Sequence, residues 1–145
     1  MTKGEKAKEL FENGLNCSQA VLCAFCDETG LSYDTSLALA SSFGGGMGRL
    51  REVCGAVSGM FMVAGLLYGS DNTKSDQYKL VQSLAGKFKE ENGSIVCREL
   101  LGIDGAQPPI PEKRTNEYYK KRPCGELVKT AADIMEEYIK EQENV

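Results

Sequence analysis

Cysteine is the residue type in this sequence with the clearest capacity for chemistry. The 145-residue chain contains six cysteines and no histidine. A thiolate is at once a nucleophile, a redox group and a metal ligand. The lack of histidine removes Ser–His and Cys–His nucleophile pairs, and it removes histidine as a ligand for zinc or haem iron. We therefore expect any transition metal held by the side chains to be bound through thiolates.

Four of the cysteines fall near the start of an expected helix, namely Cys17, Cys54, Cys97 and Cys124. The expected N-caps Asn16 and Ser94 precede two of them, and Pro123 precedes a third. The free N–H groups and partial positive charge of a helix N-terminus favour a thiolate over a thiol. Nearby arginines would add positive charge: Arg49, Arg51, Arg98 and Arg122.

Four thiolates suit an iron–sulfur cluster or a tetrahedral zinc ion. Widely spaced single cysteines favour the cluster, because structural zinc sites usually use closely paired cysteines. We predict that these four cysteines ligate one metal site, with an iron–sulfur cluster as the first expectation and zinc, or no metal, as the alternatives.

A glycine-rich run precedes Cys54 and is expected to bring the backbone close to the sulfur atoms. It reads Gly-Gly-Gly-Met-Gly over residues 44–48, and glycine permits positive φ and close approach. The run lacks the spacing of a P-loop and no strand precedes it, so a nucleotide cradle is not expected. The residues whose N–H groups are expected to reach the cofactor are Gly45, Gly46, Gly48 and Gly55.

Two other interpretations of the cysteines stay open. The first is thiol–disulfide redox chemistry without metal, which needs an exposed thiol of low pKa beside a resolving thiol. Cys54 and Cys124 are the candidates for the attacking thiol. The second is a non-catalytic, homodimeric helical interaction module in which the cysteines fill the core. Cys23 and Cys26 have CxxC spacing, but they fall in mid-helix without a βαβ context, so packing explains them more simply.

The elements that position these residues are expected to be helices. Caps and glycine stops predict helices over residues 3–13, 17–30, 34–40, 75–92, 95–102 and 124–142. Residues 103–111 are expected to form an extended Pro-rich loop, and residues 118–122 a solvated face near a further helical turn. No alternating strand pattern is present. We predict an all-α fold, a bundle of about six to eight helices that makes residues 1–145 a single domain.

An uncharged run from Val53 to Ser70 is expected to form the central, buried Gly/Ala-rich helix. It only just reaches the length of about 18 apolar residues that a membrane span needs, and several positions are Gly or Ser. Gly55 and Gly59 lie four residues apart, so a partner helix can approach closely on that face. This face, or the long helices, is where a homodimer would form.

Composition restricts the class of protein further. The net charge is −4 and no basic patch with interleaved aromatics is present, so nucleic acid is not an expected partner. The charged N-terminal segment does not resemble a signal peptide. We therefore expect a cytoplasmic protein that neither binds nucleic acid nor spans a membrane.

The ordered pattern of these residues resembles a known family. Cys17 lies in Asn-Cys-Ser-Gln-Ala-Val, Gly-Gly-Gly-Met-Gly precedes Cys54-Gly55-Ala56-Val57-Ser58-Gly59, and Cys97 and Cys124 follow. This looks like the C_GCAxxG_C_C family of redox-active proteins, although the family name places Gly before Cys. The resemblance implies a small helical protein with a redox or metal role. We expect electron transfer or redox sensing with an unknown redox partner protein, and no side chain is assigned as a general acid or base.

Overall fold

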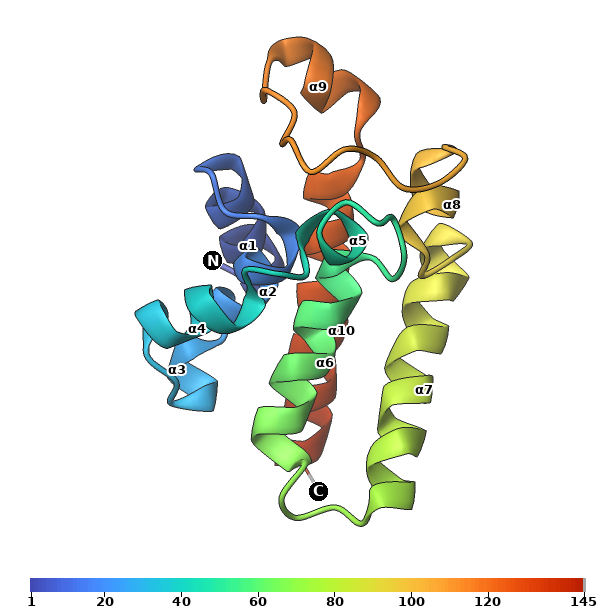
Figure 1. Cartoon of the computed structure of the whole chain (residues 1–145). Helices are drawn as coiled ribbons and strands as arrows, with labels where there is room; N and C mark the ends of the chain where they lie inside the picture. The colour runs from blue at the N-terminus through green and yellow to red at the C-terminus, as the bar shows by residue number, and fades with distance from the viewer. Residues whose placement is uncertain (145) are drawn as a thin grey trace.

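The computed structural model describes residues 1–144, and these residues form helices joined by short loops (Figure 1). The helices are α1 (Lys3–Glu12), α2 (Cys17–Ala24), α3 (Cys26–Thr29), α4 (Tyr33–Ala40), α5 (Gly44–Met47), α6 (Gly55–Tyr68), α7 (Lys74–Asn92), α8 (Cys97–Leu101), α9 (Asn116–Lys121) and α10 (Cys124–Glu143). The only β-type pairing within this range is an isolated antiparallel bridge between Val53 and Val96. The predicted all-α fold is confirmed, with more segments than expected because several are only one turn long.

Helix α6 occupies the centre of the bundle, as the sequence predicted. It packs against α2, α7 and α10, and residues from Gly55 to Met60 along it are buried. The core around it contains the fully buried side chains of Phe11, Phe25 and Phe88. No helix within residues 1–144 has the length and apolar character needed to cross a membrane.

The small-residue face of α6 is filled by α2 of the same chain. A Cβ added at Gly59 would lie 2.8 Å from the Ser18 carbonyl oxygen and 3.0 Å from Cβ of Val21. The close helix approach predicted from the Gly55/Gly59 spacing is therefore present. The idea that a second copy of the chain uses this face is wrong, because α2 already covers it.

Helix boundaries differ from the sequence prediction at two cysteines. The expected helix over residues 17–30 breaks at Phe25, whose ψ of 19° separates α2 from α3, so Cys26 begins a helix instead of lying within one. The N-cap before Cys97 is Val96, and Ser94 lies before the helix, where its hydroxyl accepts from the Val96 N–H. Cys97 is therefore the first residue of α8.

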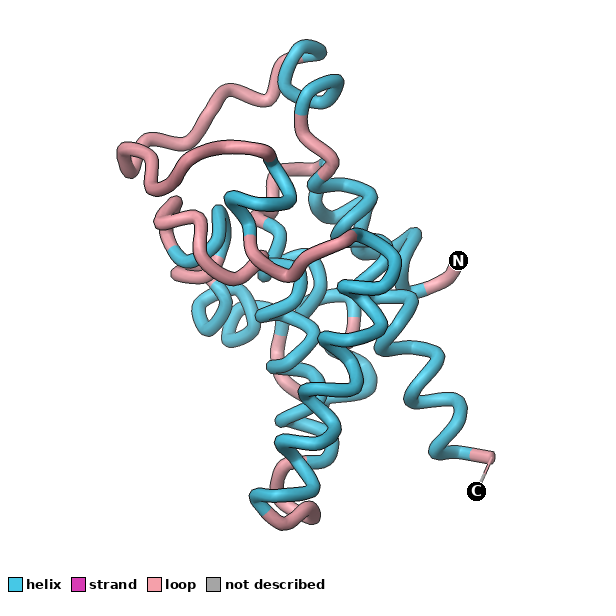
Figure 2. Tube along the Cα trace, turned by 90° about the vertical axis from the view of Figure 1, so that its right-hand side faces the viewer, coloured by secondary structure: helices cyan, strands magenta, loops and turns pink. Residues whose placement is uncertain are grey.

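Most of the loops gather at one end of the molecule (Figure 2). Helix α9 lies at this end, close to the start of α10, and α5 and α8 lie beneath it (Figure 1). The long helices α6, α7 and α10 extend away from this end. The bundle thus places the starts of several helices, and their cysteines, near one another.

Candidate functional site

A cavity of about 320 Å³ lies at the loop-rich end of the bundle. Its wall includes two cysteines, four arginines, one glutamate and one tyrosine: Cys17, Cys124, Arg49, Arg51, Arg114, Arg122, Glu112 and Tyr118. The glycine run supplies backbone to the wall through Gly44, Gly45 and Gly48. Thiols and positive charge therefore face the same half-open cavity.

Cys17 and Cys124 are the first residues of α2 and α10, and both line the cavity. Asn16 fixes the start of α2 by a capping box with Gln19, and its side-chain amide also donates to the Ser41 carbonyl oxygen. Pro123 occupies the N-cap position of α10. These local signals are the ones the sequence prediction used, and they hold both thiols at helix starts.

The Cys124 thiol is the most acidic of the cluster, with its pKa lowered from the ordinary value to about 7. A hydrogen bond from the Cys17 thiol is the largest cause, and the positive charges of Arg122 and Arg51 add to it against the effect of burial. A hydrogen bond from Tyr118 also lowers the pKa of Cys124. The same sulfur–sulfur hydrogen bond raises the pKa of Cys17 well above its ordinary value. The pair therefore combines a thiolate with a neighbouring protonated thiol near neutral pH.

Cys54 and Cys97 lie behind this pair and are buried. The Val53–Val96 bridge joins their two segments, and the Cys54 N–H donates to the Ile95 carbonyl oxygen at 2.8 Å. Burial raises the pKa of Cys54 to about 12, although the backbone N–H groups of Ala56 and Val57 oppose the change.

Cys97 is also kept protonated by its surroundings. Burial raises the pKa of its thiol, and a hydrogen bond from Nη1 of Arg51 to Cys97 Sγ, at 3.5 Å, partly counteracts this. The expectation that all four helix-start cysteines favour the thiolate is thus wrong at three of them. At Cys54 and Cys97 the loss of hydration on burial exceeds what a helix N-terminus returns, and at Cys17 the hydrogen bond to Cys124 is the largest cause. For the same reason, Cys54 is not supported as an attacking thiol.

All four predicted cysteines are close enough to affect one another's ionisation. The charges of Cys54, Cys97 and Cys124 each raise the pKa of Cys17. No three Cys, Asp or Glu side chains in residues 1–144 are placed to hold a metal ion together, however. The assignment of the four cysteines as metal ligands stays a prediction.

The glycine run adopts left-handed backbone and presses against the cysteines. Gly46, with φ of +68°, leaves so little space that an added Cβ would lie 2.6 Å from Cβ of Cys97. Gly55 similarly faces Cβ of Cys17, at 3.2 Å from an added Cβ. Gly45 and Gly48 line the cavity instead. The backbone at Gly46 and Gly55 is therefore close to the Cβ atoms of Cys97 and Cys17, and the expected approach of the four glycines to sulfur and to a cofactor stays a prediction.

Three non-glycine residues in and after this run are also left-handed: Met47, Arg49 and Arg51, with φ between 60° and 68°. Such conformations cost about 1–2 kcal/mol each for L-residues. Strained backbone of this kind persists where the surrounding structure fixes it, and it is frequent at functional sites. Here it directs two arginines toward the cavity.

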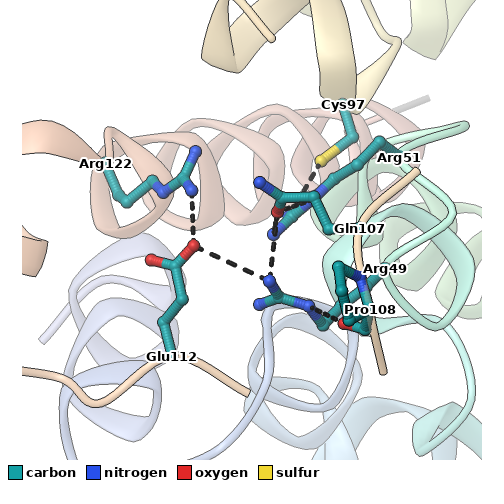
Figure 3. A network of polar contacts seen from close by, with 7 residues as sticks. All are labelled: Arg49, Arg51, Cys97, Gln107, Pro108, Glu112 and Arg122. Atoms are coloured by element: carbon teal, nitrogen blue, oxygen red, sulfur yellow. Dashed lines mark hydrogen bonds and ion pairs between the residues drawn. The ribbon is translucent and has the colours of Figure 1, made fainter. Parts of the chain in front are cut away.

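The arginines are held by a polar network around Gln107 (Figure 3). Gln107 Oε1 accepts from Nη2 of Arg51 at 2.6 Å, from Nε of Arg51 at 3.0 Å and from Nη2 of Arg49 at 3.1 Å. Glu112 pairs with Arg122 at 2.6 Å and lies 3.8 Å from Arg49. The neutral amide of Gln107 thus accepts hydrogen bonds from two arginines, where a carboxylate is the more common acceptor.

Several residues of this site were missed from the sequence. Residues 118–122 were expected to be a solvated face, yet Tyr118 lines the cavity, as does Arg122, whose charge was expected near the thiols. Arg114 donates to the carbonyl oxygens of Phe11 and Leu15, and its guanidinium stacks on the Phe11 ring at 4.1 Å. The one available signal was the Pro-rich loop itself, because a long extended loop with polar residues is frequently part of a site. Arg98, expected near the thiols, pairs instead with Glu52 outside the cavity.

Comparison with known proteins agrees with the resemblance noted from the motifs. A family model described as "Putative redox-active protein (C_GCAxxG_C_C)" matches residues 15–138. No significant match was found among curated proteins or among solved structures. The matched region covers most of the chain and contains Cys17, Cys54, Cys97 and Cys124. The chain therefore belongs to the C_GCAxxG_C_C family of redox-active proteins.

Proposed function

We propose that this protein carries out thiol–disulfide exchange, with Cys124 as the attacking thiol and Cys17 as the resolving thiol. The observation that carries the proposal is that both thiols line the same cavity at the starts of two helices, where the pKa of each depends on the other. An exchange reaction needs this combination of an accessible thiolate and an adjacent second thiol. The other cysteines do not offer it, because Cys54 and Cys97 are buried with raised pKa values.

The reaction balances as a two-electron oxidation of the protein by a disulfide substrate. The Cys124 thiolate attacks one substrate sulfur, forms a mixed disulfide and releases one thiolate. The negative charge of Cys124 is then gone, so the main reason for the raised pKa of Cys17 disappears. The Cys17 thiol loses its proton and attacks Cys124 Sγ, which releases the second substrate thiolate and leaves a Cys17–Cys124 disulfide. A reducing partner protein returns the pair to thiols.

Trapping the mixed disulfide tests this assignment. The reduced protein is treated with the neutral reagent hydroxyethyl disulfide and its mass is measured before and after peptide mapping. We expect wild type to form a Cys17–Cys124 disulfide and Cys17→Ser to stop at a mixed disulfide on Cys124. Cys26→Ser, which removes a thiol outside the cavity, should behave as wild type. If Cys124→Ser reacts as fast as wild type, the assignment is wrong.

A second candidate is a metal or iron–sulfur site at the same four cysteines. Their mutual electrostatic influence favours it, and so does the surrounding positive charge, because a thiolate-ligated cluster is anionic. Such a cluster would supply one-electron transfer when bound. Iron, zinc and acid-labile sulfide should be measured on protein purified without oxygen. Loss of metal in each single Cys→Ser variant supports this candidate, and full occupancy in all four variants contradicts it.

The setting of the proposed reaction is a reducing cytoplasm, where six free cysteines would stay reduced. A homodimer remains part of the proposal, through a surface other than the Gly55/Gly59 face. Light scattering coupled to size-exclusion chromatography measures it, and a monomer mass at micromolar concentration would contradict it.

A further inference from the structure

We propose that the cavity beside Cys124 binds a small molecule through an oxyanion, a carboxylate or phosphoryl group, with Arg122 and Arg49 as its principal ligands. In the stronger form, in which the bound molecule is the substrate of Cys124, the inference rests on the proposed function. The binding itself stands on the cavity and its charges alone.

Positive charge in the cavity exceeds negative charge. Four guanidinium groups face two negative groups, the Cys124 thiolate and the Glu112 carboxylate, and Glu112 is shared between Arg122 and Arg49. Arg122 lowers the pKa of Glu112, so the carboxylate is already ionised and has no further charge to add. An anion is the ligand that this wall lacks.

Arg51 shows the imbalance most clearly. Its side chain is buried, at 6% exposure, and its acceptors are the neutral amide of Gln107 and the sulfur of Cys97. No carboxylate lies within ion-pair distance of it among residues 1–144. The Cys124 thiolate, whose pKa both Arg51 and Arg122 lower, is shared between these two arginines, and a buried cation that is only partly neutralised is unfavourable. A bound anion in the adjoining cavity would supply the missing charge.

The geometry also leaves donors free for a ligand. Within the described residues, Arg122 uses only Nη2 for Glu112, and Arg49 leaves Nη1 without a hydrogen-bond partner. The two guanidinium groups lie on either side of the Glu112 carboxylate (Figure 3). Guanidinium groups bind carboxylate and phosphate through parallel hydrogen bonds.

The remaining wall suits the carbon part of a small molecule. Pro109 and Pro111 provide apolar lining beside the charged groups. A volume of about 320 Å³ lies at the lower end of the range for small-molecule sites. The ligand class is therefore a compact molecule with one anionic end held by arginine and its reactive part near Cys124.

Two alkylating reagents of the same size test this inference. Iodoacetate and iodoacetamide deliver the same electrophilic carbon, but only iodoacetate is an anion. The ratio of their rates at one thiol does not depend on how much of that thiol is ionised, so it reports attraction of the anion alone. We expect the ratio at Cys124, measured by mass spectrometry of labelled peptides, to exceed that of N-acetylcysteine by about tenfold at low salt.

Matched variants locate the effect. Arg122→Gln should reduce the ratio toward that of the free thiol, and Arg122→Lys should retain part of it. Arg98→Gln removes the same charge from a residue outside the cavity, so it should leave the ratio unchanged. A wild-type ratio no higher than that of N-acetylcysteine overturns the inference, and so does an equal loss in Arg98→Gln.

A second measurement separates failure of binding from failure of the proposed reaction. Melting temperatures are compared in sodium phosphate and sodium chloride at equal ionic strength. We expect phosphate to raise the melting temperature of wild type and of Cys124→Ser, but not of Arg122→Gln. If Cys124 resists both reagents, the proposed exchange reaction is wrong and this experiment alone decides on the anion site. No phosphate-specific rise in wild type or Cys124→Ser then overturns it.

Discussion

Replacing Gly46 by alanine tests whether the glycine run is shaped by contact with the cysteines. Gly46 and Gly48 have nearly the same backbone conformation, with φ of +68° and +63°. An alanine Cβ at Gly46 would lie 2.6 Å from Cβ of Cys97 and 2.9 Å from Cα of Arg51. The nearest atom to a Cβ at Gly48 is the Ser42 carbonyl oxygen, at 3.9 Å. The two substitutions therefore share a backbone cost and differ in crowding.

The magnitudes follow from these distances. Left-handed backbone costs an alanine about 1–2 kcal/mol at either position. Only Gly46→Ala must also displace Cys97 or the Arg51 backbone, and overpacking of this kind costs about 1–3 kcal/mol more. We expect Gly48→Ala to lower the free energy of unfolding by about 1–2 kcal/mol and Gly46→Ala by about 2–5 kcal/mol. The second loss is large compared with a typical total of about 5–15 kcal/mol.

Urea unfolding with a reductant present, followed by circular dichroism at 222 nm, measures both values. Slopes equal to that of wild type would show that the midpoint shift reports stability. The reasoning is refuted if the two variants lose the same free energy, because the close approach to Cys97 would then contribute nothing. Gly46→Ala should in addition change the reactivity of the cavity thiols, because it displaces Cys97 or the Arg51 backbone.

Three further outcomes are expected. The alkylation rate of Cys124 should rise with pH around a midpoint near 7. In Cys17→Ala the midpoint should move toward 9, because the hydrogen bond that lowers the pKa of Cys124 most is removed. An unchanged midpoint would contradict this. Gln107→Glu adds a carboxylate to the arginine network without changing the shape of the side chain. The ratio of the iodoacetate rate to the iodoacetamide rate at Cys124 should therefore fall, without loss of stability. A rise in this ratio would argue against the charge imbalance. Gly59→Ala should lower the free energy of unfolding by about 1–3 kcal/mol, because its Cβ would clash with α2. Gly65→Ala, whose Cβ would meet nothing within 4 Å, should raise it by about 0.5–1 kcal/mol in the same urea assay. Equal effects of the two substitutions would count against the packing of α6 on α2.

The helices could be predicted largely because their ends are local features. Asn16 caps α2, and Gly30, Gly93 and Gly102 take the left-handed conformation that ends a helix. The break at Phe25 could not be read in this way. Its side chain is fully buried, so it reflects how α2 and α3 meet the core and not a local signal in residues 17–30.

The site could be predicted only in part. The cysteines were found because their residue type and their place at helix starts are both visible in the sequence. Their protonation states could not be predicted from the sequence, because the pKa of each thiol depends on burial and on charges from other segments. The arginine wall joins the glycine run, the Pro-rich loop and the segment before α10. Positive charge from Arg49, Arg51 and Arg122 was expected because each is close in sequence to a cysteine, but the meeting of the three segments in one cavity, with Arg114 among them, emerged only from the fold.

Cys17 and Cys124 line one cavity, yet they lie near the two ends of the matched region. A disulfide there would close a loop of more than 100 residues in the unfolded chain, and such a cross-link stabilises a fold by up to about 4.7 kcal/mol through lost chain entropy. The oxidised protein would then unfold far less often than the reduced protein, and proteases that act on unfolded chains would degrade it more slowly. The amount of this protein in a cell would therefore rise after exposure to oxidants, because the oxidised form is degraded more slowly.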